Sequence, residues 1–296
     1  MINYEKCTLC PRKCQTNRVT SIGFCGGGNQ VKVARAALHQ WEEPCISGTN
    51  GSGTIFFSGC SLKCCFCQNY KISGENYGKA ITVERLAEIF LELQNQNAHN
   101  INLVNPTHYV PWIIQALNLV KDKIHIPIIY NSSGYETIET LKMLDGYIDV
   151  YLPDFKYLDS NRSLRYSKAE DYFRVASTAI EFMYKQVGEV VFDENQMIQR
   201  GVIIRHLVLP KGYHDSILIM DWISKNLPSD KILISLMSQY TPCYKSNDYP
   251  EINRRIFTFE YHKLLDFVHE NGLNGYMQDS SSAGEEYTPD FNFQGV

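Results

Sequence analysis

From residue 50 onward, short apolar runs alternate with segments of helical periodicity, and this alternation limits the folds open to the chain. The run TIFFS at residues 54–58 predicts a buried strand. Apolar residues at 83, 86, 87, 90 and 93 predict a helix over residues 83–96. Thr82 stands in position to cap that helix. Strands that alternate with helices are typical of βαβ units, which build a parallel sheet.

The alternation continues to the end of the chain. Further strands are predicted at residues 101–104, 126–130, 148–152, 202–209 and 231–237, with a weaker one at 275–277, and further helices at 111–120, 137–144, 172–187, 214–226 and 258–271. Six such units with right-handed crossovers suit a partial or closed α/β barrel, with a flat doubly wound sheet as the alternative. Gly- and Ser-rich residues 46–53 predict a division between a Cys-rich N-terminal extension, residues 1–50, and a barrel domain, residues 51–296.

Charge and hydropathy narrow the class of protein. The net charge is −4 with no long run of one sign, so we expect no nucleic-acid groove. No stretch is long and apolar enough to cross a bilayer, and the N-terminus has no apolar signal region. The chain is therefore expected to be cytoplasmic and without a membrane partner. Ten cysteines are many for a compartment that keeps thiols reduced, and clustered cysteines there more often hold metal.

One cysteine group follows the first predicted strand. Cys60, Cys64 and Cys67 form a C-x3-C-x2-C pattern at the strand's carboxyl end, where parallel βα folds place their chemistry. A four-iron, four-sulfur cluster takes one ligand per iron, so three thiolates leave one iron open. A zinc knuckle or three buried thiols is the alternative. Cys65 is expected to be a small packed residue and not a ligand.

A second group lies in the N-terminal extension. Cys7, Cys10, Cys14 and Cys25 make a full set of four, which suits closed tetrahedral zinc or an auxiliary iron–sulfur cluster. The spacing does not choose between these metals, and reduced thiols without metal are the third alternative. Because this extension has few apolar residues, a bound metal would add folding energy that its own packing lacks.

Several motifs resemble one known family. C-x3-C-x-(aromatic)-C is similar to the signature of the radical S-adenosylmethionine (radical SAM) enzymes. The stretches CTLCPRKC, GTIFFSGC, CFCQNYKIS, NLVNPTHYVP, YNSSGYE, YLPDFKY and IRHLVLP resemble the pyruvate formate-lyase activating enzyme-like group. The resemblance implies a partial (β/α)6 barrel and an oxidoreductase with a [4Fe–4S] cluster and S-adenosylmethionine (SAM). It also implies reductive SAM cleavage to a 5′-deoxyadenosyl radical, and an electron donor such as flavodoxin or ferredoxin.

The same resemblance assigns SAM contacts to later strand ends. Asp154 and Lys156 resemble a D-x-K motif whose lysine meets the SAM carboxylate, with a surface ion pair as the alternative. Arg205 resembles an arginine that contacts SAM, with a structural ion pair as the alternative. Gln239 matches a further contact loosely. His206 points to the opposite face from Arg205 and is expected to be a hydrogen-bonded core histidine.

Two other strand ends carry short polar side chains. Asn105 lies where the superfamily often has a Gly-Gly-Glu stretch for the SAM amino group, and this chain has no carboxylate there. Asn131 and Ser133 follow the third strand and suit ribose hydroxyls, although they are equally good turn formers.

Three functions remain open at this stage. The chain is expected either to make a glycyl radical on a partner enzyme or to perform radical chemistry on a small molecule or peptide. In the second case residues 279–291 are expected to cover the barrel mouth, with a disordered tail as the alternative. A metal-binding scaffold that never turns over SAM is the third reading, which the open-iron cysteine count argues against.

Overall fold

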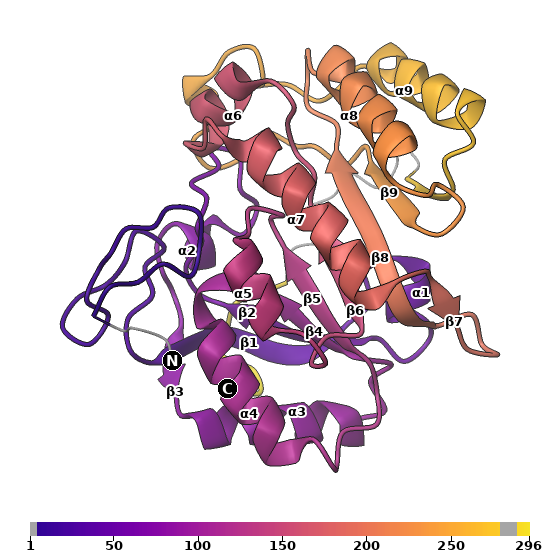
Figure 1. Cartoon of the computed structure of the whole chain (residues 1–296). Helices are drawn as coiled ribbons and strands as arrows, with labels where there is room; N and C mark the ends of the chain where they lie inside the picture. Colours follow the sequence, from indigo (N-terminus) through magenta and orange to yellow (C-terminus); the bar gives the residue numbers. More distant parts are fainter. Residues whose placement is uncertain (1–4, 279–288) are drawn as a thin grey trace.

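The computed structural model describes residues 5–278 and 289–296, and its centre is one mixed sheet (Figure 1). In that part of the chain the strand order is β10-β9-β8-β6-β5-β4-β2-β1-β3, with β7 paired to β8. The strands are β1 (Val31–His39), β2 (Ser52–Phe57), β3 (Lys79–Ile81), β4 (Ile101–Val104), β5 (Ile128–Ser132), β6 (Val150–Pro153), β7 (Val191–Phe192), β8 (Ile198–Leu207), β9 (Leu233–Met237) and β10 (Gly275–Met277).

The main helices lie on the outer side of this sheet (Figure 1). They are α3 (Val83–Asn95), α4 (Val110–Val120), α5 (Ile138–Met143), α6 (Ser160–Ser167), α7 (Tyr172–Val187), α8 (Tyr213–Asn226) and α9 (Thr258–Glu270), with short α1 (Pro44–Ser47), α2 (Tyr70–Ser73), η1 (Thr107–Tyr109) and η2 (Ser246–Asp248). Strands β2, β4, β5, β6, β8, β9 and β10 follow one another in chain order and pair in parallel. A doubly wound sheet would reverse its order at a switch point. The predicted partial α/β barrel with a Cys-rich extension is therefore confirmed.

The two faces of the sheet bury different residues. Ile55, Leu103 and Tyr130 point outward into the main apolar core against the helices. On the inner face, Cys45 and Ile46 of α1 pack into a second cluster with residues of β5, β6 and β8. Helix α1 thus fills the barrel at the end where the parallel strands begin, which leaves the carboxyl ends of the strands for a site.

Local sequence signals placed most elements correctly. The predicted helix cap is present, because Thr82 accepts a hydrogen bond from the Arg85 amide at 3.1 Å. No strand was predicted before residue 50, yet β1 pairs antiparallel with β2 over most of its length. β1 therefore belongs to the barrel sheet, although it lies on the N-terminal side of the predicted division at residue 50.

The last residues of the chain return to the first strand. The Phe293 amide donates to the Ala34 carbonyl at 3.0 Å, and the Ala36 amide donates to the Gln294 carbonyl at 2.8 Å. This pairing covers backbone groups on an edge of β1 that would otherwise be exposed. Of the stretch expected to cover the barrel mouth, residues 279–288 lie outside the described residues. Within the described residues, no helix has both the length and the apolar character needed to span a bilayer.

Candidate active site

The loop after β2 carries Cys60, Cys64 and Cys67, and backbone hydrogen bonds fix its course. The Cys65 amide donates to the Tyr166 carbonyl at 2.8 Å, and the Cys65 carbonyl accepts from the Lys245 amide at 2.8 Å. The Gly59 amide donates to the Ile72 carbonyl at 2.7 Å, which closes the loop on itself. This cysteine loop is therefore held between the end of α6 and the segment after β9.

The three thiols of the pattern lie close together. Burial, followed by the proximity of Cys64 and Cys67, raises the pKa of Cys60 to about 12. Burial and the nearby Cys64 sulfur likewise raise the pKa of Cys67 to about 11. Like charges disfavour one another at short range, so an apo site keeps these thiols protonated, and a cationic centre would be needed to hold them as thiolates. The donor set of three soft sulfurs therefore fits an iron–sulfur cluster.

Hydroxyl groups orient two of these sulfurs. Cys64 Sγ lies 3.0 Å from Ser167 Oγ, and Cys67 Sγ lies 3.1 Å from Ser73 Oγ. Groups beyond the direct ligands orient ligand side chains in many metal sites. Over the described residues, no three His, Cys, Asp or Glu side chains are gathered around a point that would hold a single metal ion.

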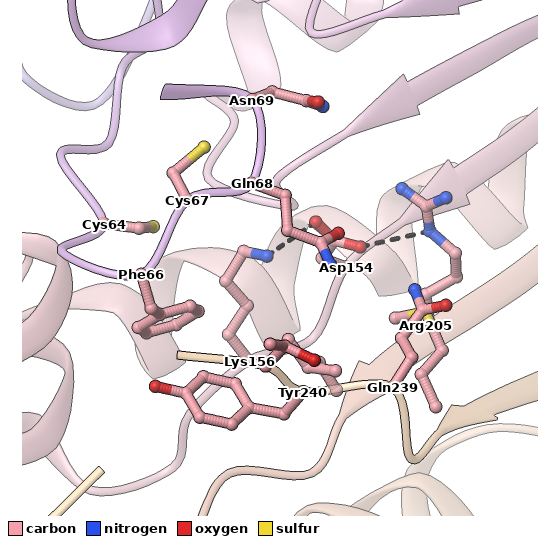
Figure 2. A pocket seen from close by; sticks show the side chains of 13 residues that line it. Cys64, Phe66, Cys67, Gln68, Asn69, Asp154, Lys156, Arg205, Gln239 and Tyr240 are labelled. Carbon is pink, nitrogen blue, oxygen red and sulfur yellow. Dashed lines mark hydrogen bonds and ion pairs between the residues drawn. The ribbon is translucent and has the colours of Figure 1, made fainter. Parts of the chain in front are cut away.

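A chain of ion pairs runs beside the cysteine loop (Figure 2). Lys156 Nζ lies 2.7 Å from Asp154 Oδ2, and Arg205 Nε lies 3.1 Å from Asp154 Oδ1. Burial alone would raise the pKa of Asp154, but the two cations lower it below its usual value. Strand pairing creates this arrangement, because Asp154 and Arg205 form a parallel bridge where β6 and β8 separate. Lys156 is thus a fixed, buried cation of the kind that can bind a carboxylate.

Glu42 is a part of the site that the sequence analysis missed. Its carboxylate accepts from Arg205 Nη1 at 3.2 Å and from Asn102 Nδ2 at 3.1 Å. Arg205 Nη2 donates to Asn131 Oδ1 at 2.6 Å. Arg205 thus contacts three acceptors inside the barrel. A buried arginine is costly without anionic partners. Arg205 in an apolar strand was therefore the one sequence signal that a second carboxylate lies nearby.

Two adjoining cavities contain the predicted residues. One has a volume of about 230 Å³ and is lined by Phe66, Gln239 and Tyr240, among others. The other has a volume of about 130 Å³ and is lined by Cys60, Asn105, Asn131 and Ser133, among others. Both share a wall made of Cys64, Cys67, Asn69, Asp154, Lys156 and Arg205. The structure therefore brings every predicted SAM contact to the rim of one divided cavity beside the cysteine loop.

The polar side chains at this rim differ in how many hydrogen bonds they make within the protein. Asn105 Nδ2 donates to the Gly59 carbonyl, so this asparagine also supports the cysteine loop. The buried Ser133 Oγ has no hydrogen-bond partner among the described residues, which fits a group that awaits a ligand. Gln239 Oε1 accepts from Gln278 Nε2 at 3.3 Å. His206 is hydrogen-bonded at both ring nitrogens, to the Phe155 carbonyl and Ser216 Oγ, which confirms its predicted core role.

The N-terminal cysteines lie next to the cysteine loop. Cys7, Cys10 and Cys25 are buried, and Cys14 is exposed. A Cβ placed on Gly23 would lie 3.5 Å from Cys25 Sγ and 3.6 Å from Cys14 Sγ, so these two sulfurs approach one point. The Cys25 carbonyl accepts from the Cys60 amide at 2.9 Å. The two cysteine sets are thus joined directly by a backbone hydrogen bond.

A partial parallel barrel with three facing cysteines at a strand's carboxyl end defines a class of protein. Residues 54–195 match the model of the radical SAM superfamily, so the chain carries a radical SAM domain. A domain of this superfamily implies SAM-dependent radical chemistry at a [4Fe–4S] cluster.

Individual relatives extend this likeness over nearly the whole chain. The "Uncharacterized protein MJ0674" of Methanocaldococcus jannaschii is 34% identical over 285 residues, covering 92% of this chain and 76% of that protein. The Streptococcus suis protein SuiB bound to precursor peptide SuiA matches with a TM-score of 0.51 at 15% identity, over 74% of this chain and 46% of SuiB. Methylornithine synthase PylB matches with a TM-score of 0.51 at 16% identity, over 82% of this chain and 65% of PylB. The chain thus spans about half the length of SuiB, and both likenesses concern the fold alone.

Proposed function

We propose that this chain binds a [4Fe–4S] cluster at Cys60, Cys64 and Cys67 and cleaves SAM reductively beside it. The observation that carries the proposal is the position of these three thiols against the wall formed by Asp154 and Lys156. When bound, the cluster and SAM would supply one-electron reductive cleavage of the C5′–S bond, with the electron from an external donor, and hydrogen-atom abstraction from a substrate.

The residues of the cavity take separate roles in this proposal. Lys156, held by Asp154, binds the SAM carboxylate. Arg205 adds a second fixed cation, and Ser133 offers its unpartnered hydroxyl to the ribose. Asn131 has both ends of its amide engaged, with Arg205 and with Glu42 at 3.5 Å, so it acts by holding Arg205.

Two further side chains complete the SAM site. Asn105 keeps its amide oxygen for the SAM amino group, since its nitrogen donates to the Gly59 carbonyl. Gln239 lines the adjoining cavity from the end of β9. Both contribute a neutral amide where a carboxylate would bind an ammonium group more strongly.

We propose two alternative classes of substrate that would lose the hydrogen atom. The first is the backbone of a glycyl radical enzyme, which follows from the resemblance to the activating enzyme-like group. The second is a small molecule or a peptide, and SuiB, the structural relative bound to a precursor peptide, supports it only as a likeness of fold. A scaffold that binds metal without turning over SAM is the weakest alternative, because three cysteines leave an iron open.

The proposal includes a second centre and a partner. Cys7, Cys10, Cys14 and Cys25 hold a metal in the N-terminal extension. A one-electron donor of the flavodoxin or ferredoxin type reduces the protein in the cytoplasm.

Anaerobic reconstitution tests the catalytic proposal. The reduced protein is incubated with SAM, and 5′-deoxyadenosine is measured together with the iron content. We expect cleavage by the native chain and none by a Cys60→Ala/Cys64→Ala/Cys67→Ala chain. A native chain loaded with about four irons that neither cleaves SAM nor changes its cluster spectrum on SAM addition would contradict the proposal and favour the scaffold.

A further inference from the structure

We propose that the four N-terminal cysteines hold an iron–sulfur cluster that relays electrons to the cluster at Cys60, Cys64 and Cys67. This inference rests on the proposed function. It assigns the metal of the extension and gives it a redox task. In each transfer one electron leaves an external one-electron reductant, passes through the N-terminal cluster and reduces the catalytic cluster, and no bond is made or broken.

Two hydrogen bonds connect the ligand segments of the two sites. The Cys60 amide donates to the Cys25 carbonyl at 2.9 Å, so one ligand residue from each set is in direct contact. Arg12, which lies between Cys10 and Cys14, donates its Nε–H to the Ser61 carbonyl at 2.8 Å. Electron tunnelling weakens steeply with distance and is favoured across bonded paths. The contacts therefore provide a short path between the centres.

Gly59 makes this close approach sterically feasible. Its φ of +89° is a backbone conformation that suits glycine, and a Cβ there would lie 2.4 Å from the Cys25 carbonyl oxygen. A side chain at this position would push the two segments apart. The contact between the two ligand segments therefore depends on Gly59.

Arg18 has a buried guanidinium that lies over the rings of Trp112 and Tyr109 but meets no carboxylate among the described residues. Its side chain is 1% exposed and no salt bridge to a carboxylate is found for it among the described residues. It donates one hydrogen bond to the His108 carbonyl, and its Nε and Nη2 have no partner within the described part of the chain. A buried cation is costly unless it is paired. An anionic metal–thiolate centre at Cys25 would supply the missing partner.

The position of Arg18 also suits an iron–sulfur cluster, whose charge changes when it is reduced. A Cβ on Gly27 would lie 2.5 Å from Arg18 Nη2 and 3.3 Å from Cys25 Sγ, so guanidinium and sulfur border the same space. The Gly27 amide donates to Cys25 Sγ at 3.4 Å. Hydrogen bonds and charge near the sulfurs set the potential of an iron–sulfur cluster. A zinc tetrathiolate would also pair with Arg18, but it has no reduction potential for these contacts to set.

The outer side of the extension provides an entry point for electrons. Cys14 is exposed there, whereas Cys64 and Cys67 line the inner cavity. Lys13 precedes Cys14 and Lys6 precedes Cys7, and both lysines are exposed on a chain whose net charge is −4. A local positive surface would attract an acidic one-electron donor to the cluster nearest the solvent.

The metal content of a chain without the catalytic ligands tests the assignment. The Cys60→Ala/Cys64→Ala/Cys67→Ala chain is reconstituted without oxygen with iron, sulfide and zinc all present. We expect it to keep about four irons and to give the electron paramagnetic resonance signal of a reduced cluster, and we expect added SAM to leave that signal unchanged. About one zinc and no iron would overturn the inference. SAM cleavage by the native chain would then still support the proposed function. A native chain that holds both clusters but does not cleave SAM would contradict the proposed function and leave the metal assignment intact.

The reduction potential tests the role of Arg18 in the same background. We expect Arg18→Gln to lower the potential by about 59 mV or more, a tenfold change in the one-electron equilibrium. Arg18→Lys keeps the charge and should keep the potential, and Lys13→Gln is the control for loss of an exposed cation. A potential that Arg18→Gln leaves unchanged would overturn the counter-ion role. If Arg18→Gln fails to fold, an unchanged potential in Arg18→Lys supports the role and a fall of that size in Lys13→Gln overturns it.

The rate of reduction tests the relay. A Cys10→Ala/Cys14→Ala chain, shown by its iron content to lack the second cluster, is mixed with reduced flavodoxin and followed by stopped flow. We expect its catalytic cluster to be reduced at least about tenfold more slowly than in the native chain, while Thr8→Ala, an exposed change between Cys7 and Cys10, has no effect. The same chain is also photoreduced, so that slow reduction by flavodoxin is separated from loss of the catalytic cluster. Reduction at the native rate would overturn the relay.

Discussion

Glu42 and Arg205 lie 163 residues apart in the chain, and their side chains form an ion pair of 3.2 Å inside the barrel. Glu42 follows β1, and Arg205 lies in β8, on the far side of the parallel strands. Asp154 contacts the same guanidinium from β6's end. Two carboxylates thus fix the orientation of the Arg205 guanidinium. This orientation decides which of its N–H groups can reach a ligand.

Removing the charge of Glu42 should weaken SAM binding. Glu42→Gln keeps the shape but loses one charge-assisted hydrogen bond to Arg205, so we expect the Kd for SAM to rise about tenfold, or roughly 1.4 kcal/mol. The measurement is a titration of the reconstituted cluster with SAM. Glu270→Gln, an exposed change on α9, is the control. An affinity within about twofold of the native value would show that Glu42 does not position Arg205.

Cys64 and Cys65 should differ sharply although they are adjacent. The Cys64 sulfur lines both cavities, whereas Cys65 packs in the outer apolar core. We expect Cys64→Ala to abolish 5′-deoxyadenosine formation and Cys65→Ala to retain it, with at most the stability loss of a small cavity, about 1 kcal/mol. Full activity of Cys64→Ala would refute the ligand assignment, and so would equal losses in both variants.

Sequence patterns predicted the elements whose signal is local. Periodicity placed α7 at residues 172–187 and β4 at residues 101–104 as the structure has them. β1 was missed because three alanines and Arg35 weaken its strand signal, and its stability comes from pairing with β2. Helix α6 was missed because its sequence, SNRSLRYS, has too few apolar residues for a helical stripe.

The residues of the candidate site likewise divide into those that local sequence predicts and those that depend on contacts between distant segments. Cys60, Cys64 and Cys67 were predictable because their spacing is contained in one loop. Glu42 was not, since its contact with Arg205 depends on how distant strands are ordered in the sheet. The hydrogen bond between Cys25 and Cys60 is equally nonlocal, and no spacing in either motif predicts it.

Glu136 should make stability depend on pH. Burial raises its pKa to about 7, although Thr107, Ser132 and Tyr130 hydrogen bonds oppose the shift. Because the folded pKa exceeds the unfolded one, the native state binds more protons between about pH 4.5 and 7, and stability falls as pH rises through this window. The shift corresponds to about 3 kcal/mol. Because burial lowers the pKa values of His39, His108 and His206, which act in the opposite sense, the test is the difference between the native chain and Glu136→Gln. Urea unfolding should show that the stability of the native chain relative to Glu136→Gln falls by about this amount from pH 5 to pH 8; a difference that does not change with pH would contradict it.

Gly59 should be needed for both cysteine sets, and Gly146 provides its control. Each glycine has a positive φ, +89° for Gly59 and +75° for Gly146, so alanine strains both backbones. A Cβ on Gly59 would meet the Cys25 carbonyl at 2.4 Å, whereas a Cβ on Gly146 meets nothing within 4 Å. We expect Gly59→Ala to lose iron and SAM cleavage, and Gly146→Ala to lose only about 1 kcal/mol of stability. Equal iron content and activity in the two variants would show that contact between the two cysteine segments is not required.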